Sequence, residues 1–217
     1  MARKSDAPSE RARIKRLHEY ARYDRATVHA ILDAMPVAHV AYMVEGRPFC
    51  TPTLQWREGD RIYWHGSAAS RMLKKSADAE VCVTVTIVDA IVLARSGFNS
   101  SVNYRSVMVF GRAESVEAVD KLARLETMME LYFPGRWATL RPASQKELKA
   151  TMLLSLPLDE VSAKVSEGMP KDEPEDYDWP VWAGLLPLSM AAGEPQSDPR
   201  NLPDLDVPDH ARRYRIG

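Results

Sequence analysis

Cysteine and glycine are both scarce in this chain of 217 residues. The two cysteines, Cys50 and Cys82, lie far apart and form no Cys-x-x-Cys pair, which argues against a disulfide scaffold and for a reducing compartment. The ten glycines are so widely spread that neither a Gly-x-Gly-x-x-Gly fingerprint nor a P-loop is present. The common phosphate-binding loops of nucleotide-binding proteins are therefore not expected here.

Several catalytic and metal-binding motifs are also missing. There is no Gly-x-Ser-x-Gly turn of a serine hydrolase and no His-Glu-x-x-His helix of a zinc protease. The histidines show no metal-ligand spacing with one another or with a cysteine. They are His18, His29, His39, His65 and His210. No metal site is expected from these patterns.

Long apolar runs and a strong excess of one charge are absent as well. The most apolar stretch, residues 81–94, is broken by Thr84, Thr86 and Asp89, so it does not suit a membrane span. The N-terminus lacks the apolar region that signal peptides carry. The 29 basic and 30 acidic residues give a net charge of −1, so neither nucleic acid nor a membrane surface is an expected partner. We expect a cytoplasmic protein.

The apolar fraction of 45% is typical of a soluble globular protein with a substantial core. Hydrophobic periodicity predicts many short strands and a few helices. Strands are expected at residues 37–44, 49–56, 61–65, 80–88, 90–95, 104–114 and 152–165. Helices are expected at residues 27–35, 68–75, 116–132 and 144–151. This order indicates a mainly β fold, a small β-barrel with flanking helices, and not a Rossmann domain.

Composition divides the chain into three parts. Residues 1–25 are rich in Lys and Arg and are expected to form a solvated basic extension with a helix. Residues 26–165 carry the predicted barrel domain. Residues 166–217 hold eight of the 15 prolines and an acidic run, which predicts extended chain. Within this tail, residues 179–188 contain two tryptophans and several aliphatic residues, so we expect this segment to dock on the barrel or on a partner subunit.

The segment with the most chemical information runs from residue 62 to residue 74, where a predicted strand leads into a predicted helix. Gly66 lets a ligand approach the backbone, and Ser67 is placed to cap the helix. A helix N-terminus with the hydroxyls of Ser67 and Ser70 and the guanidinium of Arg71 suits a phosphate group. The alternative is an ordinary capped helix with a solvated Arg71.

Three stretches and a tail motif together resemble a known family. The stretches are Arg47-Pro48-Phe49-Cys50-Thr51-Pro52-Thr53, residues 62–73 with their His-Gly-Ser and Ser-Arg core, and Asn103-Tyr104-Arg105-Ser106-Val107 running on to Phe110-Gly111-Arg112-Ala113. The tail motif is Pro180-Val181-Trp182-Ala183-Gly184-Leu185-Leu186-Pro187. In order and spacing they resemble the pyridoxamine 5′-phosphate oxidase-like FMN-binding split-barrel proteins, in particular the nitroimidazole-resistance-related branch.

The resemblance implies a six-stranded split β-barrel that forms a homodimer and binds FMN in two clefts at the subunit interface. It also implies which residues contact the cofactor. They are Ser70, Arg71 and Met72 at the phosphate; His65, Gly66 and Ser67 beside the phosphate and ribityl chain; Cys50, Thr51, Pro52 and Thr53 along the isoalloxazine ring; Arg105 and Ser106 on a strand that reaches the flavin; and Trp182, which approaches from the partner chain.

The function expected from this resemblance is FMN-dependent electron transfer from a small donor to a small aromatic or nitro substrate. The flavin and substrate motifs of true pyridoxamine-phosphate oxidases are not present, so oxidation of pyridoxamine phosphate is not expected. His65 is the candidate catalytic acid, and the alternatives are a hydrogen bond to the flavin or a structural bond. Two other functions stay open: a non-catalytic flavin- or haem-binding carrier or sensor on the same barrel, and a dimeric interaction module.

Overall fold

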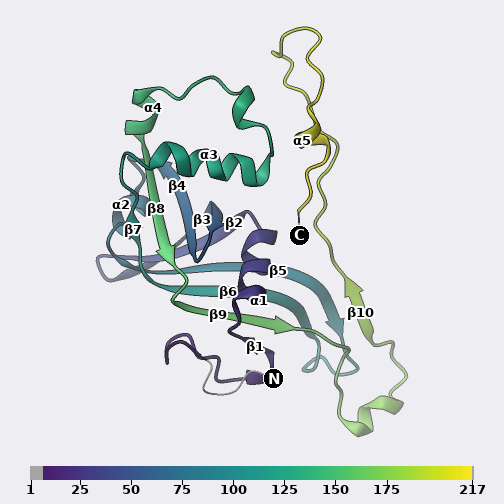
Figure 1. Ribbon diagram of the computed structural model, residues 1–217. Coiled ribbons are helices and arrows are strands. Elements are labelled where there is room, and N and C mark those ends of the chain that lie inside the picture. The colour runs from purple at the N-terminus through teal and green to yellow at the C-terminus, as the bar shows by residue number, and fades with distance from the viewer. Residues whose placement is uncertain (1–6, 217) are drawn as a thin grey trace.

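A computed structural model describes residues 7–216 as a strongly bent antiparallel sheet with helices on its faces (Figure 1). The sheet has ten strands in the order β1-β9-β6-β5-β2-β3-β4-β8-β7, and β10 pairs with β5. The strands are β1 Ala21–Arg22, β2 Val37–Val44, β3 Arg47–Glu58, β4 Arg61–Ser67, β5 Glu80–Leu93, β6 Ser101–Arg112, β7 Glu114–Ser115, β8 Thr151–Pro157, β9 Glu160–Ser166 and β10 Gly184–Pro187. The mainly β class is confirmed. The sheet has more than the six strands expected, and its order is open.

One strand, β3, pairs with two different neighbours along its length. Residues 47–54 pair with β2, and residues 55–58 pair with β4. Since β2 also pairs with β5 and β4 also pairs with β8, this change of partner divides the strands into two layers. Figure 1 shows β4 and β8 running across the direction of β5, β6 and β9. The two layers therefore meet at residues 55–58 of β3 and separate where residues 47–54 pair with β2 instead of β4.

Five α-helices and three 3-10 turns flank the strands in the part of the chain that the structure describes. The helices are α1 Arg25–Ala34, α2 Arg71–Ser76, α3 Lys121–Tyr132, α4 Gln145–Ala150 and α5 Asp209–Arg212. The turns are η1 His18–Tyr20, η2 Trp137–Thr139 and η3 Pro174–Asp178. None of the described helices is both long and apolar enough to cross a membrane.

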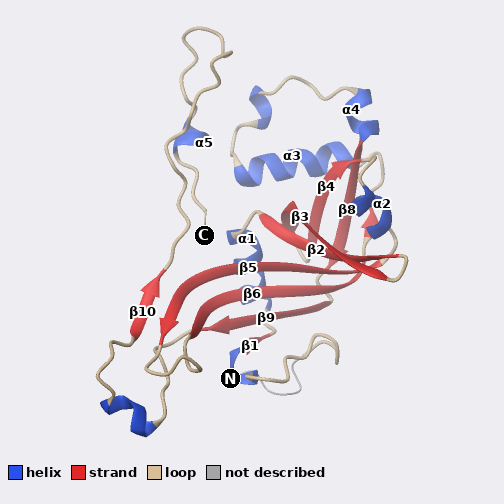
Figure 2. Cartoon of the chain, turned by 180° about the vertical axis from the view of Figure 1, so that it is seen from behind, coloured by secondary structure: helices blue, strands red, loops and turns tan. Residues whose placement is uncertain are grey.

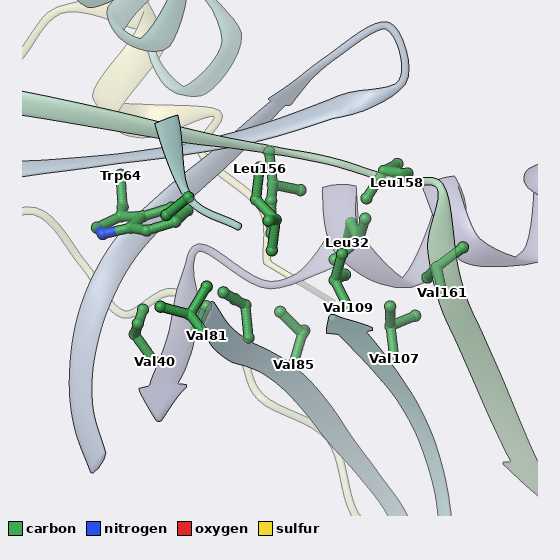
Figure 3. Close-up of a cluster of buried hydrophobic side chains, with 14 of the residues drawn as sticks. Leu32, Val40, Trp64, Val81, Val85, Val107, Val109, Leu156, Leu158 and Val161 are labelled. Carbon is green, nitrogen blue, oxygen red and sulfur yellow. The ribbon is translucent and has the colours of Figure 1, made fainter. Parts of the chain in front are cut away.

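The main core lies between the two strand layers and α1. In β5 every second residue from Val81 to Ile87 is buried, as the alternating sequence predicts. Figure 3 shows Leu32 of α1, Trp64 of β4 and Val109 of β6 within the same cluster of buried side chains. Fully burying a Val or Leu side chain stabilises the fold by about 1.5–3 kcal/mol relative to leaving it exposed. This cluster holds the two layers at a defined separation.

The ends of the predicted helices are set by contacts that periodicity does not show. α1 begins after Asp24, whose carboxylate accepts a 2.9 Å bond from the backbone N–H of Thr27, so the helix starts before the predicted position. α3 begins only at Lys121, because the preceding chain forms β7 and the N–H of Val116 bonds to the carbonyl of Leu153. Figure 2 shows α3 and α4 lying over the β4–β8 layer.

Two strand predictions are wrong in their boundaries. The two strands expected at 80–88 and 90–95 are one strand, β5, with a register shift between Val88 and Ala90. Pairing resumes past Asp89, as it does at a β-bulge, so the chain bends there without leaving the sheet. The single strand expected at 152–165 is two strands, β8 and β9, which pair with different layers.

The described segments before α1 and after β9 each add a short strand to the sheet, β1 beside β9 and β10 beside β5. Residues 7–24 contain η1 and β1 and, within what the structure describes, no α-helix, although a basic helix is expected there. In the tail, β10 pairs with the end of β5, so part of the segment at 179–188 does dock on its own sheet. Trp179 and Trp182 remain 67% and 63% exposed, however. Figure 2 shows the chain continuing from β10 as a long extended loop that leads to α5.

Candidate functional site

Most of the expected site residues flank the place where the two strand layers separate. β3 pairs with β4 only over residues 55–58, and residues 65–67 of β4 pair only with β8. Residues 47–54 of β3 likewise pair with a strand on one side only, that of β2. Each strand therefore turns an edge without a strand partner toward the separation. Backbone groups along such edges are free to bind a ligand.

The short helix α2 is seated on the end of β4. A methyl group added to Gly66 would lie 3.2 Å from Cδ1 of Leu73, whose side chain is fully buried. Ser70 caps the helix, its hydroxyl oxygen accepting a bond from the N–H of Leu73. The predicted cap, Ser67, is wrong: its hydroxyl oxygen accepts from the N–H of Ala69 instead. Both hydroxyl hydrogens stay available to donate to a ligand.

Arg71 and Met72 begin α2 but face in different directions. The guanidinium carbon of Arg71 lies 4.5 Å from the centre of the Phe49 ring, so this exposed side chain reaches from α2 to β3. Met72 is 7% exposed and belongs to the main core. Its side chain therefore supports the helix, while Arg71 is the one presented to a ligand.

His65 has an unusual environment for a half-buried histidine. Its Nδ1 atom is buried and has no hydrogen-bond partner, and no partner of Nε2 is found among the described residues. Burial lowers the pKa of His65 below its ordinary value, so the imidazole is neutral around pH 7. The ring of Trp56 meets it edge-on at 5.9 Å between ring centres. A structural hydrogen bond, one of the alternatives for His65, is not formed within the described chain.

The four expected residues on β3 point to opposite faces of the sheet. Thr51 and Thr53 face inward, and the hydroxyl of Thr51 lies 3.3 Å from that of the buried Tyr42. Cys50 and Pro52 are exposed on the outer face. Because side chains alternate along a strand, a flat ligand on one face of β3 can contact the side chains of only two of these four residues. A ligand at the edge of the strand can contact the backbone of all four.

Arg105, Ser106 and Trp182 lie at the other end of the molecule. The carbonyl of Ala113, at the end of β6, accepts a bond from the N–H of Asp78, just after α2. Arg105 lies about 25 Å back along the extended chain from Ala113, and is therefore far from α2. Its guanidinium makes a two-pronged bond to Asp89, with N–O distances of 2.7 and 3.0 Å. Ser106 points to the opposite, outer face. One chain therefore does not bring Arg105 or Ser106 to Arg71.

A hollow of about 430 Å³ opens beside Arg105. Asn103 and the strand β10 residues Leu185 and Pro187 contribute to its walls. Trp182 precedes this strand, and its ring covers Gly184 so closely that a methyl group there would lie 2.7 Å away. The docked tail thus forms part of this second hollow.

A cavity of about 530 Å³ lies elsewhere and has none of the expected residues in its walls. It is formed by the end of α1, β3, the end of α3 and the C-terminal segment. Its lining includes Trp56, Tyr132, His210 and Tyr214. Sequence reasoning missed it because nothing local predicts that α5 folds back on α3, where Phe133 meets Tyr214 at 5.4 Å. Trp56 lines this cavity and also meets the ring of His65.

Residues 7–216 contain no group of three His, Cys, Asp or Glu side chains that could hold a metal ion.

The family model described as pyridoxamine 5′-phosphate oxidase matches residues 24–165. The chain belongs to this family, so the family resemblance drawn from its motifs is confirmed. No match is found among the curated proteins.

Solved structures of similar proteins cover nearly the whole chain. The flavocytochrome Anf3 from Azotobacter vinelandii is 48% identical, over 97% of this chain and 99% of its own, with a TM-score of 0.94. The FAD and haem binding protein from Mycobacterium smegmatis is 36% identical, over 91% of this chain and 98% of its own, with a TM-score of 0.87. A 5-nitroimidazole-resistance-like protein from Bacteroides thetaiotaomicron, 20% identical over 67% of this chain and 86% of its own with a TM-score of 0.55, shares the fold.

Proposed function

We propose that this chain is a redox protein that binds both a flavin and a haem. The observation that carries the proposal is the similarity to a flavocytochrome over 97% of the chain, together with that to an FAD and haem binding protein over 91%. Both similarities include the tail beyond residue 166, which the family model does not match. The same tail forms part of the hollow beside Arg105.

The flavin phosphate is assigned to the start of α2. The guanidinium of Arg71 has no hydrogen-bond acceptor among the described residues, and Ser67 and Ser70 each have a hydroxyl hydrogen to donate. The unpaired edges of β3 and β4 are assigned to the ring and the ribityl chain. A flavin needs apolar walls, a phosphate anchor and a few polar groups near its ring, and this separation between the layers supplies all three.

The haem ligand is assigned to His65. A haem iron takes a neutral imidazole, and burial holds His65 in that form with no partner on Nδ1. His29 bonds to Asp60 at 2.9 Å and is already engaged, whereas His210 packs edge-on against Phe133 and has no buried, unpaired nitrogen like that of His65 among the described residues. His39 also lacks a described partner, but it is exposed on the outer face, where the imidazole is not desolvated.

The chemistry is electron transfer. A flavin held at this site would supply two-electron chemistry with a reduced nicotinamide or similar donor, and a haem would supply one-electron transfer to a small acceptor. The protein's part is to hold the phosphate through Arg71 and Ser70, to keep His65 neutral, and to exclude water with the core side chains beneath β3 and β4. A non-catalytic carrier or sensor is the second candidate, because the same residues bind the cofactors in either case.

We further propose that the complete site is shared between two copies of the chain. The expected flavin contacts Arg105 and Trp182 lie too far from Arg71 to join it within one chain. Four apolar side chains are exposed on the outer face of the sheet, with two of them directly opposite each other in the β2–β3 register and the other two further along the same face. They are Val37, Met43, Leu54 and Met108. Such a face is a candidate for burial against a second copy.

The flavin is proposed to be FAD. The resemblance in the motifs implies FMN, whereas the Mycobacterium smegmatis relative, 36% identical, is an FAD binding protein. The two flavins share the phosphate that Arg71 would bind, so the choice depends on where the adenosine part lies. We assign this part to the hollow beside Arg105 in the partner subunit.

The first experiment is a visible absorbance spectrum of the purified protein, followed by heat release and mass identification of the flavin. A Soret band together with FAD is the expected result. Released FMN would retain the flavin assignment and replace FAD. A colourless protein that also takes up neither added flavin nor haem would overturn the proposed function.

Two variants then locate the haem. His65→Ala is expected to lose the Soret band, whereas His39→Ala is the matched control and should keep it. The reverse pattern would move the haem to the outer face. Anaerobic addition of a reduced nicotinamide separates catalysis from carriage, because a flavin that is never reduced by any donor favours the carrier or sensor.

A further inference from the structure

Arg71 differs from the other described arginines that lie over aromatic rings. Arg11, Arg95 and Arg124 each combine a ring contact with an ion pair to a carboxylate. Arg71 lies over Phe49, and within residues 7–216 no carboxylate or carbonyl accepts a bond from it. Its guanidinium is therefore held by a ring face alone.

This mode of contact leaves the donors of Arg71 free. A guanidinium stacked on a ring uses its flat face, while all its N–H groups point outward in the guanidinium plane. An ion pair would instead occupy those N–H groups and reduce the charge seen by a ligand. The contact with Phe49 thus orients Arg71 without satisfying it.

Phe49 is itself fixed in place. Its ring stacks on Tyr42 with 5.8 Å between ring centres and 23° between the ring planes. Tyr42 is 4% exposed and lies directly across from Phe49 in the β2–β3 register, and its hydroxyl lies 3.3 Å from that of Thr51. The chain of contacts runs from the buried core through two rings to Arg71. A ring held in this way restricts where the guanidinium can lie.

We infer that Phe49 is a positioning residue that orients Arg71 toward the phosphate oxygens of the flavin nucleotide. This inference rests on the proposed function. An exposed arginine loses rotamer freedom when it binds an anion, and a stack formed before binding removes part of that loss. Phe49 acts through Arg71 and is not assigned any contact with the cofactor.

The test compares Phe49→Leu with the conservative Phe49→Tyr in the full-length chain freed of bound flavin. Flavin fluorescence titration measures the Kd of FMN and FAD, which carry the phosphate, and of riboflavin, which does not. Loss of a surface cation–π contact is expected to weaken FMN and FAD by about two- to fivefold in Phe49→Leu. Riboflavin binding should be unchanged, and Phe49→Tyr should restore the wild-type Kd because it keeps the ring.

The Arg71→Ala background provides a second readout. If Phe49 acts through Arg71, Phe49→Leu has no further effect on FMN affinity there. An equal loss for riboflavin, or the same loss in the Arg71→Ala background, would overturn the inference and leave the flavin assignment intact. A wild-type chain that binds none of the three flavins would overturn the proposed function as well. Far-UV circular dichroism confirms that each variant is folded.

Discussion

Gly66 of β4 and Leu73 of α2 are in direct contact across the start of the helix. A methyl group on Gly66 would lie 3.2 Å from Cδ1 of Leu73. The Leu73 side chain is fully buried and has little room to move. The backbone of Gly66 is not in the left-handed region, so close packing and not a special dihedral angle requires glycine here. This contact sets the height of α2, and hence of Arg71, above the end of β4.

Gly66→Ala is therefore expected to destabilise the fold by about 1–3 kcal/mol, the usual cost of overpacking. Denaturant unfolding followed by circular dichroism measures this change. Gly97→Ala is the matched control, because Gly97 is exposed and has nothing within 4 Å of an added methyl group. Equal stability of the two variants would show that α2 shifts without cost.

Asp24→Ala is expected to lower the free energy of unfolding by about 1 kcal/mol through loss of the α1 cap. The bond from the backbone N–H of Thr27 lowers the pKa of Asp24 below its ordinary 3.8. The folded pKa is the lower one, so the charged cap contributes fully above 3.8 and loses its contribution as the pH falls through the folded value.

The cost of Asp24→Ala should accordingly shrink as the pH is lowered from 7 to the lowest pH at which the fold persists. Denaturant titrations of the variant and the wild type across this range provide the comparison. Asp24→Asn keeps a side-chain acceptor at every pH, so its stability should vary less over the same range. A cost that is independent of pH would contradict the assignment of a charged cap.

Asp172 holds the loop after β5 to the tail. Its carboxylate is fully buried and accepts bonds from the backbone N–H groups of Arg95 and Ser96 and from the guanidinium of Arg95. Burial raises the pKa of Asp172, but these bonds outweigh burial and the net shift is downward. Arg95 in turn stacks on Tyr177 at 4.7 Å.

Asp172→Asn is expected to destabilise the fold by about 2 kcal/mol, because a charged acceptor of several bonds is replaced by a neutral one. Thermal unfolding at neutral pH measures the change. Asp198→Asn is the control: Asp198 pairs with Arg200 at the surface, where an ion pair contributes little. A larger loss for Asp198→Asn than for Asp172→Asn would contradict the structural account.

Trp182→Ala should leave stability within about 0.5 kcal/mol of wild type, because the side chain is largely exposed. Its flavin content and its dimer fraction should fall, since the ring is proposed to contact a partner subunit. Flavin absorbance and sedimentation velocity report these two quantities. Trp179→Ala removes an equally exposed tryptophan and should change neither. A wild-type chain that sediments as a monomer at micromolar concentration would overturn the shared site.

The local sequence predicted several features of the fold because burial follows simple periods. Alternation from Val81 to Ile87 predicts a half-buried strand, and α1 buries Val28, Ile31 and Leu32 as its spacing predicts. The motif around His65 and Arg71 indicated the family, which the comparison confirms. Neither prediction required knowledge of what the strand or helix packs against.

Periodicity could not predict features that depend on partners distant in the chain. Ser70 rather than Ser67 caps α2, because Leu73 must reach the space above Gly66. β5 continues through the bulge at Asp89 because β6 pairs with it before and after Asp89, and β10 pairs with the residues that follow. The cavity beside Trp56 exists only because α5 returns to α3.

The sequence by itself determined the mainly β class, the strand faces and the family, since each depends on residue type and short spacing. The tertiary structure decided that Arg71 lies over a ring with no hydrogen-bond acceptor among the described residues, and that the half-buried His65 has a buried nitrogen without a partner there. Both depend on groups brought together from separate elements: Phe49 of β3 beneath Arg71 of α2, and Trp56 of β3 against His65 of β4. The sequence determines which side chains carry a charge, but the neighbours that the fold places beside a side chain determine whether it can bind a ligand.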